Sequence, residues 1–130
     1  MPKQVIKLSS TKKDQLVNIT KQVQDAIDFD DGILTIFCPH TTAGLTINES
    51  ADPDVARDVL MKLEKIVSED SDFRHAEGNS VAHIKASLIG SSLQVLVEKG
   101  SLRLGTWQGI FLAEFDGPRT RNVWLMYNIQ

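Results

Sequence analysis

Residues 35–49 read TIFCPHTTAGLTINE, and this stretch indicates two strands joined by a short polar turn. An apolar run stops at Pro39, and residues 45–47 then alternate between apolar and polar side chains, which is typical of a half-buried strand. His40 stands between the two runs and is followed by two threonines. A histidine at a strand end, beside hydroxyl groups, is well placed to meet a ligand or to act as a base.

Outward from this stretch, the apolar periodicity predicts further strands and helices. Strands are expected at residues 5–8, 16–19, 33–38, 42–48, 93–98, 106–115 and 123–129, and helices at 20–27, 53–67 and 82–89. Two apolar pairs within 33–38 predict burial of that strand on both faces. Thr20 is the expected N-cap of the first helix, Asp52 and Pro53 are typical of a helix start, and Gly90 of a helix end. Because the strands cluster late in the chain, the expected fold class is α+β. We expect one compact domain over residues 1–130, with a mixed or antiparallel sheet of about seven strands and two or three helices.

Length and composition exclude several classes of protein. The chain has 130 residues, the size of one domain, and a net charge of −3, which argues against a general nucleic-acid partner. No apolar stretch approaches the ~18–20 residues that span a bilayer, so no membrane partner is expected. The single cysteine, Cys38, excludes an intrachain disulfide and is expected to be a small buried residue. With no signal-peptide pattern, these features predict a cytoplasmic protein.

The histidines His40, His75 and His83 are the whole histidine content of the chain. Neutral imidazole is a common zinc ligand, and three protein ligands with one open position is the pattern of catalytic zinc sites. The spacing matches no short metal motif, so two interpretations stay open at this point. The three side chains either converge on one divalent metal or are unrelated surface and core histidines.

Several polar residues are candidates for chemistry or for ligand contacts. Glu49 can act as a general base, orient an imidazole, or simply be a charge at a strand end. Lys85, Ser87, Arg119 and Arg121 are candidate contacts for an anion such as phosphate. Solvated surface residues are the alternative, and a solvated surface charge is the favoured interpretation of Arg121. Gln108, next to a tryptophan and between two glycines, is a candidate hydrogen-bond partner for a polar ligand.

Five motifs occur in a characteristic order. They are His-Thr-Thr-Ala-x-x-x-x-Asn-Glu (40–49), Asp-Phe-x-His (72–75), Ala-His-x-Lys-Ala-x-Leu-x-Gly-x-Ser (82–92), Gly-x-Leu-x-Leu-Gly-Thr-Trp-Gln-x-Ile (100–110) and Glu-x-Asp-Gly-Pro-Arg (114–119). Over nearly the full chain this arrangement resembles the YjbQ-like family, also called secondary thiamine-phosphate synthase enzymes. One departure is Phe73, where the family usually has tyrosine.

The resemblance implies a homotrimer of α+β subunits and a metal site built from His40, His75 and His83. It also implies a weak thiamine-phosphate synthase activity. In that reaction the nitrogen of a thiazole phosphate displaces pyrophosphate from an aminopyrimidine methyl diphosphate. Three imidazoles favour zinc as the divalent metal, and magnesium remains an alternative with a diphosphate substrate because it prefers oxygen ligands.

On this interpretation the expected catalytic residues are Glu49, His40 and Lys85. The residues expected to bind the small phosphorylated substrate are Thr41, Thr42, Ser87, Gln108 and Arg119. Two other functions stay open: a metal-dependent hydrolase that uses water at the histidine site with Glu49 as base, and a non-catalytic trimeric protein that binds a metal or metabolite. Trp107 and Trp124 are candidates for contacts between subunits.

Overall fold

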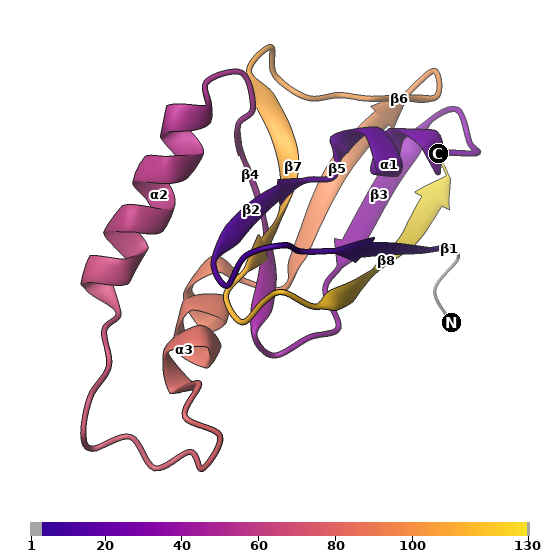
Figure 1. The fold of residues 1–130 in the computed structure, drawn as a ribbon. Helices are drawn as coiled ribbons and strands as arrows, with labels where there is room; N and C mark the ends of the chain where they lie inside the picture. The colour runs from indigo at the N-terminus through magenta and orange to yellow at the C-terminus, as the bar shows by residue number, and fades with distance from the viewer. Residues whose placement is uncertain (1–3, 130) are drawn as a thin grey trace.

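The computed structural model describes residues 4–129, which form two antiparallel sheets and three helices (Figure 1). The larger sheet has the strand order β1-β8-β3-β5-β6, and the smaller one has the order β2-β7-β4. The strands are β1 Gln4–Ser9, β2 Gln15–Asn18, β3 Gly32–Phe37, β4 Ala43–Glu49, β5 Ser92–Glu98, β6 Ser101–Leu102, β7 Gln108–Glu114 and β8 Thr120–Ile129.

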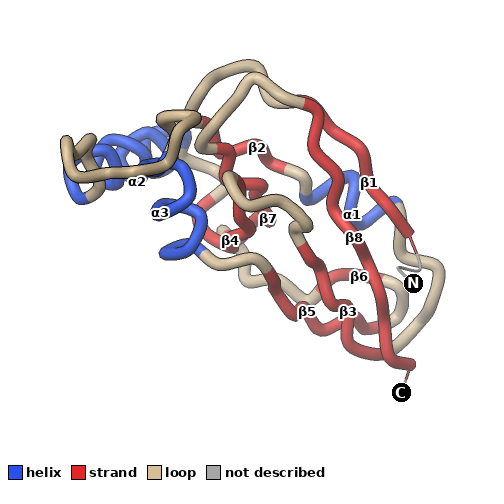
Figure 2. Tube along the Cα trace, turned by 90° about the horizontal axis from the view of Figure 1, so that it is seen from below, coloured by secondary structure: helices blue, strands red, loops and turns tan. Residues whose placement is uncertain are grey.

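The helices are α1 Thr20–Asp25, α2 Pro53–Ile66 and α3 Ser80–Ile89, and Figure 2 shows α2 and α3 together at one end of the molecule. The start of α2 is as predicted, because the Asp52 carboxylate accepts the Asp54 N–H at 2.9 Å. The end of α3 at Gly90, with φ at 99°, is also as predicted. None of the helices in this described part is long and apolar enough to cross a membrane.

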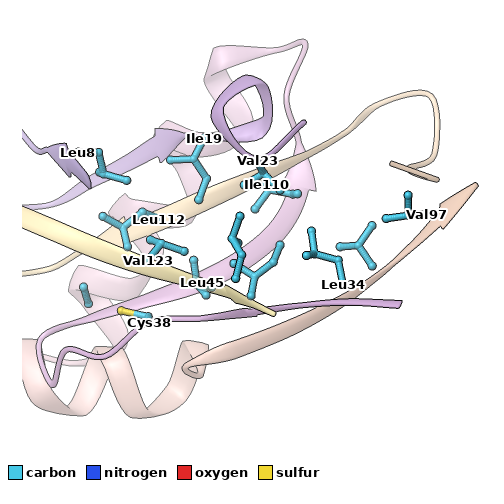
Figure 3. Close-up of a cluster of buried hydrophobic side chains, with 14 residues drawn as sticks. Leu8, Ile19, Val23, Leu34, Cys38, Leu45, Val97, Ile110, Leu112 and Val123 are labelled. Atoms are coloured by element: carbon cyan, nitrogen blue, oxygen red, sulfur yellow. The ribbon is translucent and has the colours of Figure 1, made fainter. Parts of the chain in front are cut away.

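The main core lies between the two sheets (Figure 3). Its side chains come from both sheets and include Leu34 and Val123 from the larger one and Leu45 and Leu112 from the smaller one. Cys38 belongs to this core as expected, and burial raises the pKa of its thiol.

A second, smaller cluster packs α3 onto the other face of β7. Ala82 and Ala86 of α3 lie against Ala113 and Phe115. Because β7 contributes to both clusters, residues 109–115 are buried without interruption. This packing fixes α3, which carries His83, on the smaller sheet.

The α+β class and the antiparallel pairing are confirmed, but the strands divide into two sheets instead of one. Periodicity marks strands without saying which strands pair, so the division was not visible in the sequence. Two local predictions were wrong. Residues 33–38 were expected to be buried on both faces, whereas β3 alternates. Thr20 does not cap α1; its hydroxyl donates to Asn18 and accepts the Ile110 N–H. The strand predicted at 106–115 begins at Gln108, so Trp107 precedes it and is 63% exposed.

Candidate functional site

The three histidines, which come from three separate segments, line one pocket of about 350 Å³. His40 lies in the turn between β3 and β4, His75 in the loop between α2 and α3, and His83 on α3. The remaining lining residues are polar or charged apart from one proline: Pro39, Thr41, Thr42, Glu77, Asn79, Asp116, Arg119 and Arg121. The pocket therefore combines imidazoles with both signs of charge.

A close contact between two backbones holds the histidine-bearing elements together. A Cβ atom at Gly44 would lie 2.5 Å from the carbonyl oxygen of Gly90, so only glycine allows β4 to approach the end of α3. The Leu45 N–H donates to the same carbonyl oxygen at 3.0 Å. This contact fixes the start of β4, and with it the His40 turn, against the helix that carries His83.

His75 and His83 lie edge to face, with ring centroids 5.1 Å apart and an interplanar angle of 87°. Two imidazoles bound to one tetrahedral zinc ion would also have centroids about 5 Å apart, because each nitrogen lies ~2.0–2.1 Å from the metal. The spacing of this pair therefore fits two ligands of a single ion.

His40 does not fit as a third ligand in this arrangement. Its Nε2 atom accepts the backbone N–H of Asn122 at 2.9 Å, so the lone pair of that nitrogen is already used. Burial and the nearby Arg121 guanidinium both lower the pKa of His40. Within residues 4–129, no group of three His, Cys, Asp or Glu side chains is arranged to hold a metal ion.

A buried ion pair underlies the pocket. Arg121 is 4% exposed and Glu114 is 0% exposed. Nε of Arg121 donates to Oε1 of Glu114 at 2.9 Å, and Nη2 donates to Oε2. Arg121 also donates to Oγ1 of Thr42 at 2.8 Å, and Ser10 donates to Glu114 at 2.7 Å. Burial alone would raise the pKa of Glu114, but the bonds from Arg121 and Ser10 hold it below its usual range.

This ion pair corrects two interpretations of the sequence. Arg121 was expected to be a solvated surface charge, and it is buried. Thr42 was expected to bind substrate, but it is 6% exposed and its hydroxyl accepts from Arg121. The hydroxyl therefore orients the guanidinium, whereas Thr41, the exposed neighbour, keeps its place on the pocket wall.

Asp116 organises the rim of the pocket. Its carboxylate accepts from Asn79 and from Arg119, both at 2.9 Å, and Arg119 also donates to its backbone carbonyl oxygen. Burial would raise the pKa of Asp116, and these donors lower it below its usual value. The Arg119 side chain, 52% exposed, is thereby held at the pocket. Oδ1 of Asn79 is buried and has no hydrogen-bond partner among the described residues.

Sequence reasoning did not single out Asn79, Asp116 or Glu77 as pocket residues. Asp116 had a signal, because it lies in the same motif as Arg119 and directly precedes Gly117-Pro118. Asn79 and Glu77 carry no comparable signal. They are ordinary polar residues of a loop, and only the path of the chain after α2 brings them to the pocket.

Lys85 is not a pocket residue, which corrects the expectation that it contacts an anion. Its side chain is 0% exposed, and its ammonium group donates to Asp14 at 2.8 Å and to Glu64. Burial would lower the pKa of Lys85, but these two carboxylates raise it. Residues two positions apart on a helix point to different sides, so Lys85 faces away from the side occupied by His83.

Ser87 lies one helical turn beyond His83 and donates its hydroxyl to the His83 carbonyl oxygen at 2.9 Å. It lines a neighbouring hollow that shares His40, Thr41 and His83 with the pocket. Its hydroxyl is already engaged by the helix backbone, and its role as a substrate contact stays a prediction.

Glu49 and Gln108 lie at the far end of the smaller sheet. They pair with each other across β4 and β7, whereas Ala43 and Glu114 form the pair at the pocket end. The β4 strand separates the two ends by about 20 Å at its usual rise per residue. The Glu49 carboxylate accepts the Ala51 N–H at 3.0 Å, and Oε1 of Gln108 accepts the Gly105 N–H at 2.8 Å. Within one subunit, neither residue reaches the pocket, which corrects the base and ligand roles expected for them there.

The chain matches a family described as UPF0047 protein YjbQ-like over residues 4–129. It is 46% identical to UPF0047 protein YugU of Bacillus subtilis over 124 residues, covering 92% of this chain and 94% of that protein. It is 48% identical to UPF0047 protein MJ1081 of Methanocaldococcus jannaschii over 121 residues, covering 91% and 88%.

Solved structures show the same fold. A crystal structure of an uncharacterized conserved protein of the yjbq/upf0047 family from Clostridium acetobutylicum has a TM-score of 0.92 and 52% identity, covering 96% of this chain and 99% of that one. A YbjQ-like protein of unknown function from Sulfolobus solfataricus has a TM-score of 0.91 and 32% identity, covering 98% and 96%. The match of a family sequence model to almost the whole chain, with relatives this similar, shows that the chain belongs to the YjbQ-like UPF0047 family.

Proposed function

We propose that the pocket binds a small phosphorylated substrate beside a divalent metal, with zinc the expected ion, and catalyses displacement of pyrophosphate. The observation that supports this proposal best is that His40, His75, His83 and Arg119 line one pocket. The specific reaction proposed is the one implied by the sequence resemblance, in which a thiazole phosphate and an aminopyrimidine methyl diphosphate are joined.

His75 and His83 are the residues that would hold the metal, because their rings have the spacing of two ligands. When bound, the ion would supply positive charge to the oxygen of the departing pyrophosphate. Arg119 would donate hydrogen bonds to phosphate oxygens, and Thr41 offers a hydroxyl on the same wall. The Asp116 carboxylate would hold the guanidinium of Arg119 in place during binding.

The absence of Glu49 from this pocket favours the transfer over hydrolysis. The thiazole nitrogen attacks the methylene carbon with its lone pair, the carbon–oxygen bond to diphosphate breaks, and the electron pair leaves with pyrophosphate. The attacking nitrogen carries no proton, so the step needs no general base. Hydrolysis would need one to take a proton from water, and Glu49, the base predicted for that role, is at the far end of β4. A metal-dependent hydrolase is therefore the second candidate.

We also propose a homotrimer, as the resemblance implies. The outer face of the larger sheet carries exposed apolar side chains: Val5, Phe37, Leu96, Trp124 and Met126. Trp124 pairs with Val5 on one side and with Phe37 on the other, and the Phe37 and Trp124 rings lie 5.8 Å apart. An exposed apolar surface of this kind is typical of a contact between subunits, and Trp107 is a third exposed aromatic residue.

A turnover assay tests the proposed reaction. Purified protein is mixed with the aminopyrimidine methyl diphosphate, with and without the thiazole phosphate, and pyrophosphate is measured. We expect release that requires both substrates, stops on addition of a chelator and is absent in His83→Ala. Release that does not require the thiazole phosphate would favour the hydrolase, and no release under any condition would count against both enzymes.

A further inference from the structure

The hydrogen bond at His40 determines which ring nitrogen carries the proton. Nε2 accepts the Asn122 N–H at 2.9 Å, so this nitrogen has no proton of its own. A neutral imidazole has one donor and one acceptor nitrogen, and an imidazolium has two donors. The ring is therefore neutral, with its proton on Nδ1, and the burial of His40 beside Arg121 is consistent with a neutral ring.

The strand arrangement explains why this bond forms. The pairing of β8 with β3 ends at Trp124 and Phe37, so at Asn122 the chain of β3 has already left the sheet. On the side of β8 that faces β3, the Asn122 N–H therefore has no backbone acceptor from a strand. Nε2 of His40 accepts this N–H instead. Swinging Nε2 toward a metal would leave this backbone donor without an acceptor, which is costly at a half-buried position.

We propose that His40 is a hydrogen-bond donor to the anionic group of the substrate, through Nδ1–H, and is not a ligand of the metal. This inference rests on the proposed function for the presence of an anionic substrate. Within residues 4–129 no hydrogen bond engages Nδ1, and His40 lines both the pocket and the adjoining hollow. His40 would thus act together with Arg119 on the anion, while His75 and His83 hold the metal.

Nitrogen NMR of histidine-labelled protein tests this assignment directly. Chemical shifts and proton couplings of the His40 ring are recorded for the protein alone, with zinc, and with pyrophosphate. We expect a proton on Nδ1 and none on Nε2 in the protein alone. Zinc should shift nitrogens of His75 and His83 to values typical of ligands, and pyrophosphate should shift Nδ1 of His40. A proton on Nε2, or a zinc-ligand shift at His40, would overturn the proposal.

Two substitutions of His40 distinguish a hydrogen-bond donor from a metal ligand through the affinities for pyrophosphate and zinc alone. His40→Asn keeps an amide N–H near the position of Nδ1, whereas His40→Gln places its amide near Nε2 and leaves no donor at Nδ1. We expect His40→Gln to weaken pyrophosphate binding about tenfold to a hundredfold, the worth of a hydrogen bond to a charged group, and His40→Asn to weaken it much less. Zinc affinity should be unchanged in both.

The failure of this inference is distinct from the failure of the proposed function. If neither zinc nor pyrophosphate binds the wild-type protein, the proposed function fails and the donor role fails with it. If both bind but the two substitutions abolish zinc binding alike, the pocket has the proposed function and His40 is a metal ligand. Equal loss of pyrophosphate affinity in both variants, with zinc affinity intact, would also overturn the donor role of Nδ1.

Discussion

Replacing Glu114 with glutamine keeps the shape of a fully buried side chain and removes its charge. The carboxylate accepts from Arg121, Ser10 and the Asp116 N–H, so the substitution leaves the Arg121 guanidinium buried without its counter-ion. Breaking a buried ion pair by removing one partner costs about 3–5 kcal/mol. Because glutamine keeps one acceptor oxygen, we expect a loss near the lower value, about 3 kcal/mol of the free energy of unfolding.

The pH dependence of this loss has a definite sign. The pKa of Glu114 is lower in the folded protein than its usual value, so its contribution to stability is fully present above the unfolded pKa of about 4.3. That contribution disappears as the pH falls through the folded pKa. The glutamine variant has no such group, so the gap in stability between the two proteins should narrow from about pH 4.5 downward. The Asp116 carboxyl titrates in both proteins and cancels in the comparison.

Urea denaturation of both proteins at pH 7 and at several acid pH values measures this gap. Glu49→Gln is a matched control, because it makes the same chemical change at a half-buried strand end and should cost no more than about 0.5 kcal/mol. A loss below about 1 kcal/mol at pH 7 for Glu114→Gln, or a gap that does not change with pH, would refute the reasoning.

Three further substitutions test the packing, the surface and the pocket boundary. Lys85→Met should cost about 1–3 kcal/mol of the free energy of unfolding, since the two carboxylates that pair with Lys85 can become hydrated. It should leave pyrophosphate affinity unchanged, and weaker pyrophosphate binding by the folded variant would contradict the position of Lys85 outside the pocket. Gly44→Ala should cost about 1–3 kcal/mol in thermal or urea unfolding, because its Cβ meets the Gly90 carbonyl oxygen, and a neutral result would contradict that close contact. Trp124→Asp should convert the proposed trimer, three times 14.4 kDa by light scattering, into smaller species; a wild-type monomer at every concentration would contradict the trimer itself.

Much of the local structure could be predicted because it depends on neighbouring residues. Asp52 and Pro53 start α2, and Gly90 ends α3, for reasons that lie within one turn of each helix. The alternation within residues 42–48 predicted a strand, and β4 at Ala43–Glu49 lies within one residue of it. These features need no knowledge of the rest of the fold.

The site was harder to predict because strand and helix directions decide which motif residues meet. Glu49 is close to His40 in sequence, but β4 carries it to the opposite end of the sheet. Lys85 is two residues from His83, and the helical turn directs it into the interior. Arg121 looked like a surface charge because its partner, Glu114, lies on another strand. Each error comes from using sequence distance in place of position in the fold.

Calorimetric titration of zinc into the metal-free protein tests the central claim most directly. We expect one ion bound per chain in the wild-type protein. Affinity should fall by about a hundredfold or more in His75→Ala and in His83→Ala, because each would remove a ligand, while Lys85→Met should bind as the wild type does. No zinc binding by the wild-type protein, or unchanged affinity in the folded His83→Ala variant, would contradict a metal site at His75 and His83.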